Sequence, residues 1–187
     1  WRIALNGVLP DDLVVKHVQQ VPSDFHARHS SVGKRYRYLV CNLPYRSPFS
    51  RNKSWWVRKS LNLEAIREAS SYLIGKHDFS AFRAAACSSP NPNKDLREIL
   101  CDVKPWLHAN LCFELEADSF LQHMVRIMVG TLVQVGTGKL KPEQMKGILE
   151  SRDRTQAGLT APAHGLYALA VRYPEDRIEW PDELMDL

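Results

Sequence analysis

The chain has 187 residues, of which 44% are hydrophobic, and its formal net charge at pH 7 is +4. This length can bury a good core in one domain, or in one and a half. The apolar residues form no run that could cross a membrane and no secretory or transit segment is recognised, so we expect no membrane association. Four cysteines without metal-ligand spacing predict reduced thiols and no metal site: Cys41, Cys87, Cys101 and Cys112.

The positive charge is concentrated in one segment. Between Phe25 and Leu63 the sequence contains no Asp or Glu, and aromatic residues are interspersed among the basic ones. Cations with aromatic rings between them are typical of proteins that bind single-stranded or looped RNA, where bases stack and phosphates pair. We therefore expect an RNA partner, with an ordinary solvated charged face as the alternative.

The first predicted elements are strands. Residues 13–21 alternate loosely and are rich in β-branched side chains, which favours a strand. Residues 34–42 alternate more clearly, so Arg35 and Arg37 fall on one face of a strand and Tyr36 falls on the other.

A short aromatic strand is predicted at 54–58, followed by a helix at 63–74. Asn62 is suited to cap the start of this helix, and Gly75 to end it. Residues 77–95 contain a run of Ser, Pro and Asn and are predicted to form a loop.

Strands and helices are mixed in the second half. Two antiparallel strands are predicted at 97–104 and 110–117, around a turn near Pro105. A short helix at 143–151 and a last strand at 165–173 complete the chain. Because strands and helices do not alternate as βαβ units, the fold class is α+β, with a mostly antiparallel sheet and helices packed on one face.

A long apolar helix is predicted between these strands and the short helix. It is capped by Asp118 or Ser119, reaches about Val135, and is apolar nearly all the way round, so it should be buried on most faces. Arg126 lies in its middle, and a buried guanidinium needs an anionic partner. Asp118 and Glu116 precede the helix rather than lying one turn along it, so we expect the partner elsewhere, with a local salt bridge as the alternative.

Five segments carry recognisable motifs in a fixed order. They are DFHAR at 24–28, KRYRY at 34–38, HDFSAFR at 77–83, FLQHMVR at 120–126 with Gly130, and TAPAHGLY at 160–167. In order and spacing they resemble the tRNA pseudouridine synthase A family from near Asn6 to Tyr173. The resemblance implies a pseudouridine synthase-like fold, with the remainder of the N-terminal lobe at 1–60, the C-terminal lobe at 61–175 and an acidic tail at 176–187.

The resemblance also implies an activity. Members of this family isomerise uridine to pseudouridine in the anticodon stem-loop of tRNA without metal or cofactor, and they flip the target nucleotide out of its stack. Their catalytic aspartate lies in a segment of the type GRTDAGVH, upstream of the region that matches Asn6. This sequence contains no such segment and opens on Trp1, so we expect it to be a portion of the enzyme that is inactive alone.

Roles for individual residues follow from the same resemblance. Tyr36 would face the flipped base and help to remove its C5 proton, and Arg126 would pair with the aspartate. Gly165 and Leu166 would line the floor of the pocket. The candidates for RNA contact are His26, Arg28, Lys34, Arg35, Arg37, Phe82, Arg83 and His123.

Some of these residues have structural alternatives. For Tyr36 and Phe82 the alternative is packing in the core, and for His123 it is a core histidine with its hydrogen bonds satisfied. For Lys34, Arg35 and Arg37 the alternative is a solvated face of the strand. The alternative functions are an RNA-binding module without chemistry and a structural or dimerisation fragment. The expected partners are tRNA and a second copy of the chain in a homodimer, in the cytoplasm, with an organelle left open.

Overall fold

The computed structural model describes residues 1–104, 110–174 and 178, and it divides into two compact units. Unit one comprises residues 1–31 with the C-terminal residues from 173 onward, and unit two comprises residues 32–172. Each unit is described by itself. Within the described residues, no helix combines the length and apolar character needed to cross a membrane.

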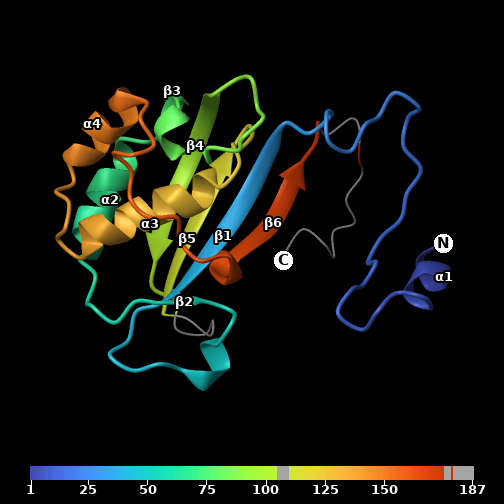
Figure 1. Ribbon diagram of the computed structural model, residues 1–187. Helices are drawn as coiled ribbons and strands as arrows, with labels where there is room; N and C mark the ends of the chain where they lie inside the picture. The colour runs from blue at the N-terminus through green and yellow to red at the C-terminus, as the bar shows by residue number, and fades with distance from the viewer. Residues whose placement is uncertain (105–109, 175–177, 179–187) are drawn as a thin grey trace. The chain divides into compact units, whose positions relative to one another are not determined.

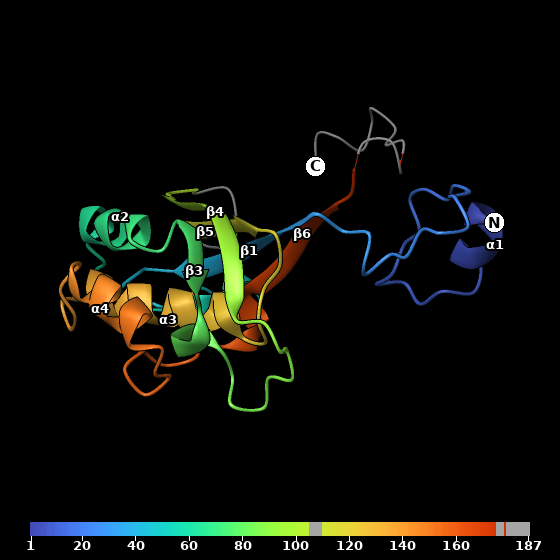
Figure 2. The ribbon, with the colours of Figure 1, turned by 90° about the horizontal axis from the view of Figure 1, so that it is seen from above.

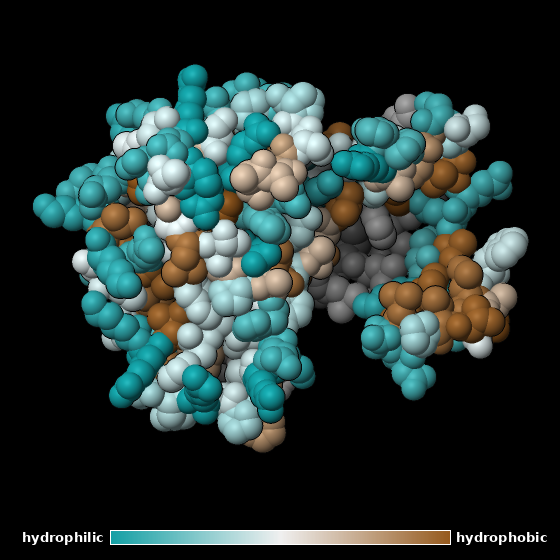
Figure 3. All heavy atoms as spheres, in the orientation of Figure 1, coloured by the Kyte–Doolittle hydropathy of each residue, from teal (hydrophilic) through white to brown (hydrophobic). Residues whose placement is uncertain are grey.

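Unit one contains a single short helix and no strand among its described residues. Helix α1 spans Arg2–Asn6, and the Asn6 side chain bonds both backbone groups of Val15, at 2.7 and 2.9 Å. The prediction of a strand at 13–21 is wrong, because no described segment provides the hydrogen-bonded partner that a strand requires. Apolar side chains gather on the surface of this unit (Figure 3), and Trp1 is 89% exposed.

Unit two is built on a six-stranded sheet (Figure 1). Its strands are β1 Gly33–Cys41, β2 Trp55–Trp56, β3 Gly75–Asp78, β4 Asn93–Asp102, β5 Leu111–Ala117 and β6 Leu166–Arg172. The order is β2-β1-β5-β4-β3, and β6 also pairs with β1. Only β1 and β2 run parallel among these pairs. The predicted α+β class with a mostly antiparallel sheet is confirmed.

Three helices accompany this sheet: α2 Leu63–Ser71, α3 Met124–Gly136 and α4 Gln144–Ser151. Helix α3 lies across one face (Figure 2), where Tyr38 of β1 and Phe113 of β5 share a buried cluster with Met128 of the helix. The other face carries Arg35 and Arg37, together with the buried pair of Leu39 and Cys112. The predicted alternation along β1 is therefore correct, because its tyrosines and its arginines face opposite sides.

Helix α3 begins later than expected. Asp118 does not cap it, because its carboxylate accepts a hydrogen bond from the backbone N–H of Asp95 at 3.1 Å. The N-cap is His123, whose φ of 62° is left-handed and rare for a residue with a side chain. The helix can lie against the chain near Leu159 because residue 130 is glycine: a Cβ there would lie 1.8 Å from the Leu159 carbonyl oxygen.

The remaining predicted elements differ from the observed ones mainly in where they begin and end. The Asn62 cap is confirmed, since its side chain accepts from the Ala65 N–H at 3.1 Å, although α2 ends at Ser71. The loop predicted at 77–95 is wrong at both ends: β3 reaches Asp78 and pairs with the start of β4, without any apolar alternation that could have predicted it. The turn predicted near Pro105 lies outside the described residues.

Candidate active site

A pocket of about 330 Å³ opens at the start of α3. Its walls come from β1, from the segment that leads into α3, from the first turn of that helix, and from the turn before β6. The lining residues are Tyr36, residues 120–126, Ala163 and Leu166. The structure thus brings together four of the predicted site residues, Tyr36, His123, Arg126 and Leu166, although they are far apart in the sequence.

Arg126 is held by the backbone of a neighbouring segment. Its Nε donates to the Ala161 carbonyl at 2.7 Å, and the Ala161 N–H donates back to the Arg126 carbonyl at 3.0 Å. The terminal nitrogens of the guanidinium have no partner among the described residues. No described carboxylate lies within ion-pair distance of Arg126.

The alternative of a local salt bridge to Arg126 is wrong within the described residues. Glu116 pairs instead with Arg172 at 3.0 Å and with Arg35 at 3.6 Å, and Asp118 binds backbone N–H groups. Within residues 1–104, 110–174 and 178, the predicted deficit of negative charge around Arg126 therefore persists.

The free groups of Arg126 and Tyr36 are accessible to a ligand. In the described part of the chain, no buried polar side-chain atom lacks a hydrogen-bond partner. The terminal nitrogens of Arg126 and the hydroxyl of Tyr36 have no partner there, so they are not buried. Phe120 packs edge-on against the Tyr36 ring, with centroids 5.2 Å apart, and fixes its orientation. The pocket thus presents the two terminal nitrogens of the Arg126 guanidinium and the phenol hydroxyl of Tyr36 to a ligand.

Tyr38 supports the same site from the core, although sequence reasoning did not select it. Its hydroxyl donates to the Pro162 carbonyl at 2.6 Å, which anchors the turn that lines the pocket. Burial raises the pKa of Tyr38, and the nearby charge of Arg126 opposes this rise in part. Gly165 permits the packing, because a Cβ there would lie 2.7 Å from Cζ of Tyr38. Gly165 therefore supports the wall and does not itself line the pocket.

His123 lines the pocket, and Arg83 lies in a loop next to it. His123 is exposed, so the alternative of a core histidine is wrong. Its left-handed backbone belongs to a class of strained conformations that cluster at functional sites. The Arg83 guanidinium donates to the Cys87 carbonyl at 2.8 Å, and the adjacent Ala84 N–H donates to the Gln122 carbonyl at 3.0 Å. The loop that carries Arg83 therefore borders the lining segment.

The predicted contact of Phe82 with RNA does not fit the structure. Its side chain is fully buried and packs against Phe79, with ring centroids 6.2 Å apart. A base cannot stack on a ring that has no exposed surface, so the structure favours the packing alternative for Phe82.

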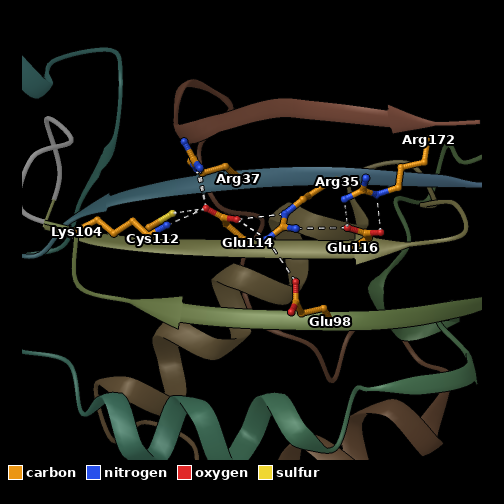
Figure 4. A network of polar contacts seen from close by, with 8 residues as sticks. All are labelled: Arg35, Arg37, Glu98, Lys104, Cys112, Glu114, Glu116 and Arg172. Atoms are coloured by element: carbon orange, nitrogen blue, oxygen red, sulfur yellow. Dashed lines mark hydrogen bonds and ion pairs between the residues drawn. The ribbon is translucent and has the colours of Figure 1, made fainter. Parts of the chain in front are cut away.

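Arg35 and Arg37 belong to a charged network on the face opposite Tyr36 (Figure 4). Glu114 accepts from Arg35 at 2.8 Å and from Arg37 at 2.7 Å, and Lys104 lies 3.3 Å away. Burial would raise the pKa of Glu114, but these hydrogen bonds outweigh it and lower the pKa to about 2. Both guanidinium groups are therefore already ion-paired with a carboxylate.

The other basic candidates are more exposed. Lys34 is half-exposed at the start of β1. His26 and Arg28 are exposed in unit one, where the His26 Nδ1 accepts from the Arg28 N–H at 3.1 Å. That segment is tied to the end of the unit by Phe25, whose ring lies 5.1 Å from that of Tyr173. Their contact with RNA stays a prediction.

The described residues contain no group of three or more His, Cys, Asp or Glu side chains placed to hold a metal ion. The four cysteines are free and buried.

Comparison with known proteins defines the class. Residues 69–174 match the family model of tRNA pseudouridine synthases. The chain therefore belongs to that family of isomerases.

Individual relatives sharpen the assignment to one branch, and each of them is a tRNA pseudouridine synthase A. A Thermoanaerobacter sp. (strain X514) relative is 44% identical over 170 residues, covering 91% of this chain and 68% of its own. The Acetivibrio thermocellus relative is 44% identical over 173 residues, which cover 92% of this chain and 70% of the relative's own length. The Hydrogenovibrio crunogenus relative is 38% identical over all 187 residues and 70% of its own length. The resemblance found in the sequence is thereby confirmed.

Proposed function

We propose that the chain carries the base-binding side of an active site that isomerises uridine to pseudouridine in the anticodon stem-loop of tRNA. One observation carries the proposal: the end of the Arg126 guanidinium and the Tyr36 hydroxyl, neither of which has a partner among the described residues, line the same pocket of about 330 Å³. A pocket of this size suits a single base that has been flipped out of its stack.

Arg126 is suited to orient a carboxylate. With its Nε fixed on the Ala161 carbonyl, the two terminal nitrogens form a fork that can bind both oxygens of an aspartate. The opposite charge would keep that aspartate ionised and ready to act as a nucleophile. In this role Arg126 is a positioning residue, since it acts through the aspartate.

Tyr36 is suited to the second half of the reaction. After the aspartate attacks the base or the sugar, the glycosidic bond breaks, the base turns and rejoins the sugar through C5, and the bond to the aspartate breaks again. The C5 proton must then leave, and the Tyr36 hydroxyl is the unpartnered polar group of β1 that lines the pocket. His123 lines the pocket and the loop of Arg83 borders it, so both would contact the RNA backbone, with His26, Arg28 and Lys34 in support.

The sequence contains no GRTDAGVH-type segment and the described residues place no carboxylate beside Arg126, so the 187 residues should not form pseudouridine by themselves. The test is release of tritium from 5-tritiated uridine in tRNA. The chain alone should release none, whereas a chimaera that adds the segment preceding the match in the Thermoanaerobacter relative should release it. Turnover by the chain alone would refute the missing nucleophile. A folded chimaera that binds tRNA without turnover would refute the isomerase proposal.

The second candidate is an RNA-binding module without chemistry, which is favoured by the lack of a carboxylate beside Arg126 among the residues that the structure describes. It predicts tRNA binding by the chain and no tritium release from any chimaera. We also propose a homodimer, which the mass of the chain in solution would test, and a cytoplasmic location. The division into lobes at 1–60 and 61–175 stays part of the proposal, and all but one residue of the acidic tail at 176–187 lies outside the described residues.

A further inference from the structure

A second pocket, of about 540 Å³, opens beside β2. No step of the proposed reaction uses it. Its lining comes from the end of β1, the loop between β1 and β2, strand β2 itself, and the turn before β6, and it includes Arg46, Arg51, Trp56 and His164.

The charge of this second pocket is positive. Arg46 and Arg51 line it, and none of the described residues in its lining is acidic. The sequence offers no Asp or Glu from Phe25 to Leu63, so this stretch cannot neutralise the two arginines. Arg51 is exposed, and its guanidinium has no hydrogen bond or ion pair with any described residue. Such a group is ready to bind an anion, and a guanidinium matches phosphate geometry well.

An aromatic wall lies beside these cations. Trp56 is half-buried, and its Nε1 donates to the Leu43 carbonyl at 3.0 Å, which fixes the ring. The guanidinium carbon of Arg46 lies 4.6 Å from the ring centroid. Because Arg46 is exposed, a base can displace its guanidinium from this ring and stack on the indole in its place. An aromatic surface and a free guanidinium together select a nucleotide rather than a bare anion.

The two pockets share one turn. His164 lines the second pocket, while its neighbour Ala163 lines the pocket of Tyr36 and Arg126. The His164 Nε2 lies 3.1 Å from the Ser54 carbonyl, which ties the turn to the loop of the second pocket. From the core, Tyr38 holds the same turn through Pro162. A strand of RNA that crosses this turn can therefore place one nucleotide on each side of it.

We propose that the second pocket binds a further nucleotide of the RNA, with its base against Trp56 and its phosphate on Arg51, while the target uridine occupies the first pocket. This inference rests on the proposed function for the identity of the ligand as RNA. Because every base has an aromatic face, the second pocket should hold its nucleotide with little preference among bases.

A charge-reversal pair tests the proposal in the 187-residue chain. The probe is a fluorescently labelled anticodon stem-loop RNA, and its Kd is measured by anisotropy at several salt concentrations. Arg51→Glu should weaken binding by about ten-fold and lower the log–log salt slope by about one. Arg58→Glu is the matched control, because Arg58 is exposed in the same basic segment and lines neither pocket. Its Kd should change by less than about three-fold.

An abasic scan of the loop tests the stacking contact. One loop position other than the target should lose about five-fold or more in affinity when its base is removed, and this loss should vanish in Trp56→Ala. If Trp56→Ala does not fold, the comparison of Arg51→Glu with Arg58→Glu decides.

Equal effects of Arg51→Glu and Arg58→Glu, or no effect of either, would overturn the second pocket and leave the proposed function standing. A wild-type chain that does not bind the stem-loop at all would overturn the proposed function together with this inference.

Discussion

The arginines on the two sides of the sheet differ in whether a carboxylate pairs with them. On the open face, Arg35 and Arg37 share Glu114, and the surrounding charges are nearly balanced by Glu98 and Glu116. On the helix-covered face, Arg126 finds only a backbone carbonyl among the described residues. A partly buried cation that its own fold neutralises contributes to structure, whereas one left without a carboxylate marks where something else must bind.

Removal of Arg126 should have the largest effect of the changes considered. In the chimaera that supplies the aspartate, Arg126→Ala should lower tritium release by about 100-fold or more, because the carboxylate loses its orienting fork. Arg126→Lys keeps the charge without the fork and should fall between the two. If Arg126→Ala retained near wild-type activity, the helix-covered face would hold no functional cation and the contrast between the faces would fail.

Gly130→Ala should disrupt the helix-covered face by overpacking. Its Cβ would collide with the Leu159 carbonyl, so α3 and the segment that holds Arg126 must separate, at a cost of about 1–3 kcal/mol in unfolding free energy. Gly147→Ala in α4 is the control, because a Cβ there meets nothing within 4 Å and should stabilise the helix by about 0.5–1 kcal/mol. Thermal unfolding of both variants measures the difference, and an unchanged Gly130→Ala would contradict the close packing.

Glu114→Gln should destabilise the open face by about 1–3 kcal/mol, because two guanidinium groups lose their shared acceptor. The pH dependence has a definite sign. Folding lowers the pKa of Glu114 from 4.5 to about 2, so its contribution is complete above pH 4.5 and is lost as the pH falls towards 2. Urea unfolding across this range should show a smaller pH dependence in Glu114→Gln, and an identical profile would mean that the network does not stabilise the fold.

A surface ion pair should matter least. Lys146 lies 3.8 Å from Glu150 on α4, and both side chains are more than half exposed, at 63% and 65%. Lys146→Gln should therefore change the unfolding free energy by less than about 0.5 kcal/mol. A loss as large as that of Glu114→Gln would show that burial is not what separates the network on the open face from ordinary surface pairs.

Sequence reasoning was strongest where a pattern is local. The alternation of KRYRY placed the tyrosines and the arginines of β1 on opposite faces, and the apolar run around Arg126 predicted a buried helix without an internal partner. It was weaker where pairing decides the structure: β3 forms because β4 lies beside it, whereas 13–21 forms no strand because no described segment pairs with it. The carbonyl of Ala161 had no signal at all, since any residue supplies a backbone carbonyl.

The four buried cysteines make the fold unusually easy to interrogate with thiol reagents. Cys101 and Cys112 lie on adjacent strands, and burial raises their pKa to about 12 and about 11, so alkylation of the native sheet should be slow. Backbone N–H groups of Gln122 and Ser89 hydrogen-bond to the Cys87 sulfur and lower its pKa. Rates of alkylation at these positions would therefore report separately how often the sheet opens and how often the chain next to the pocket entrance does.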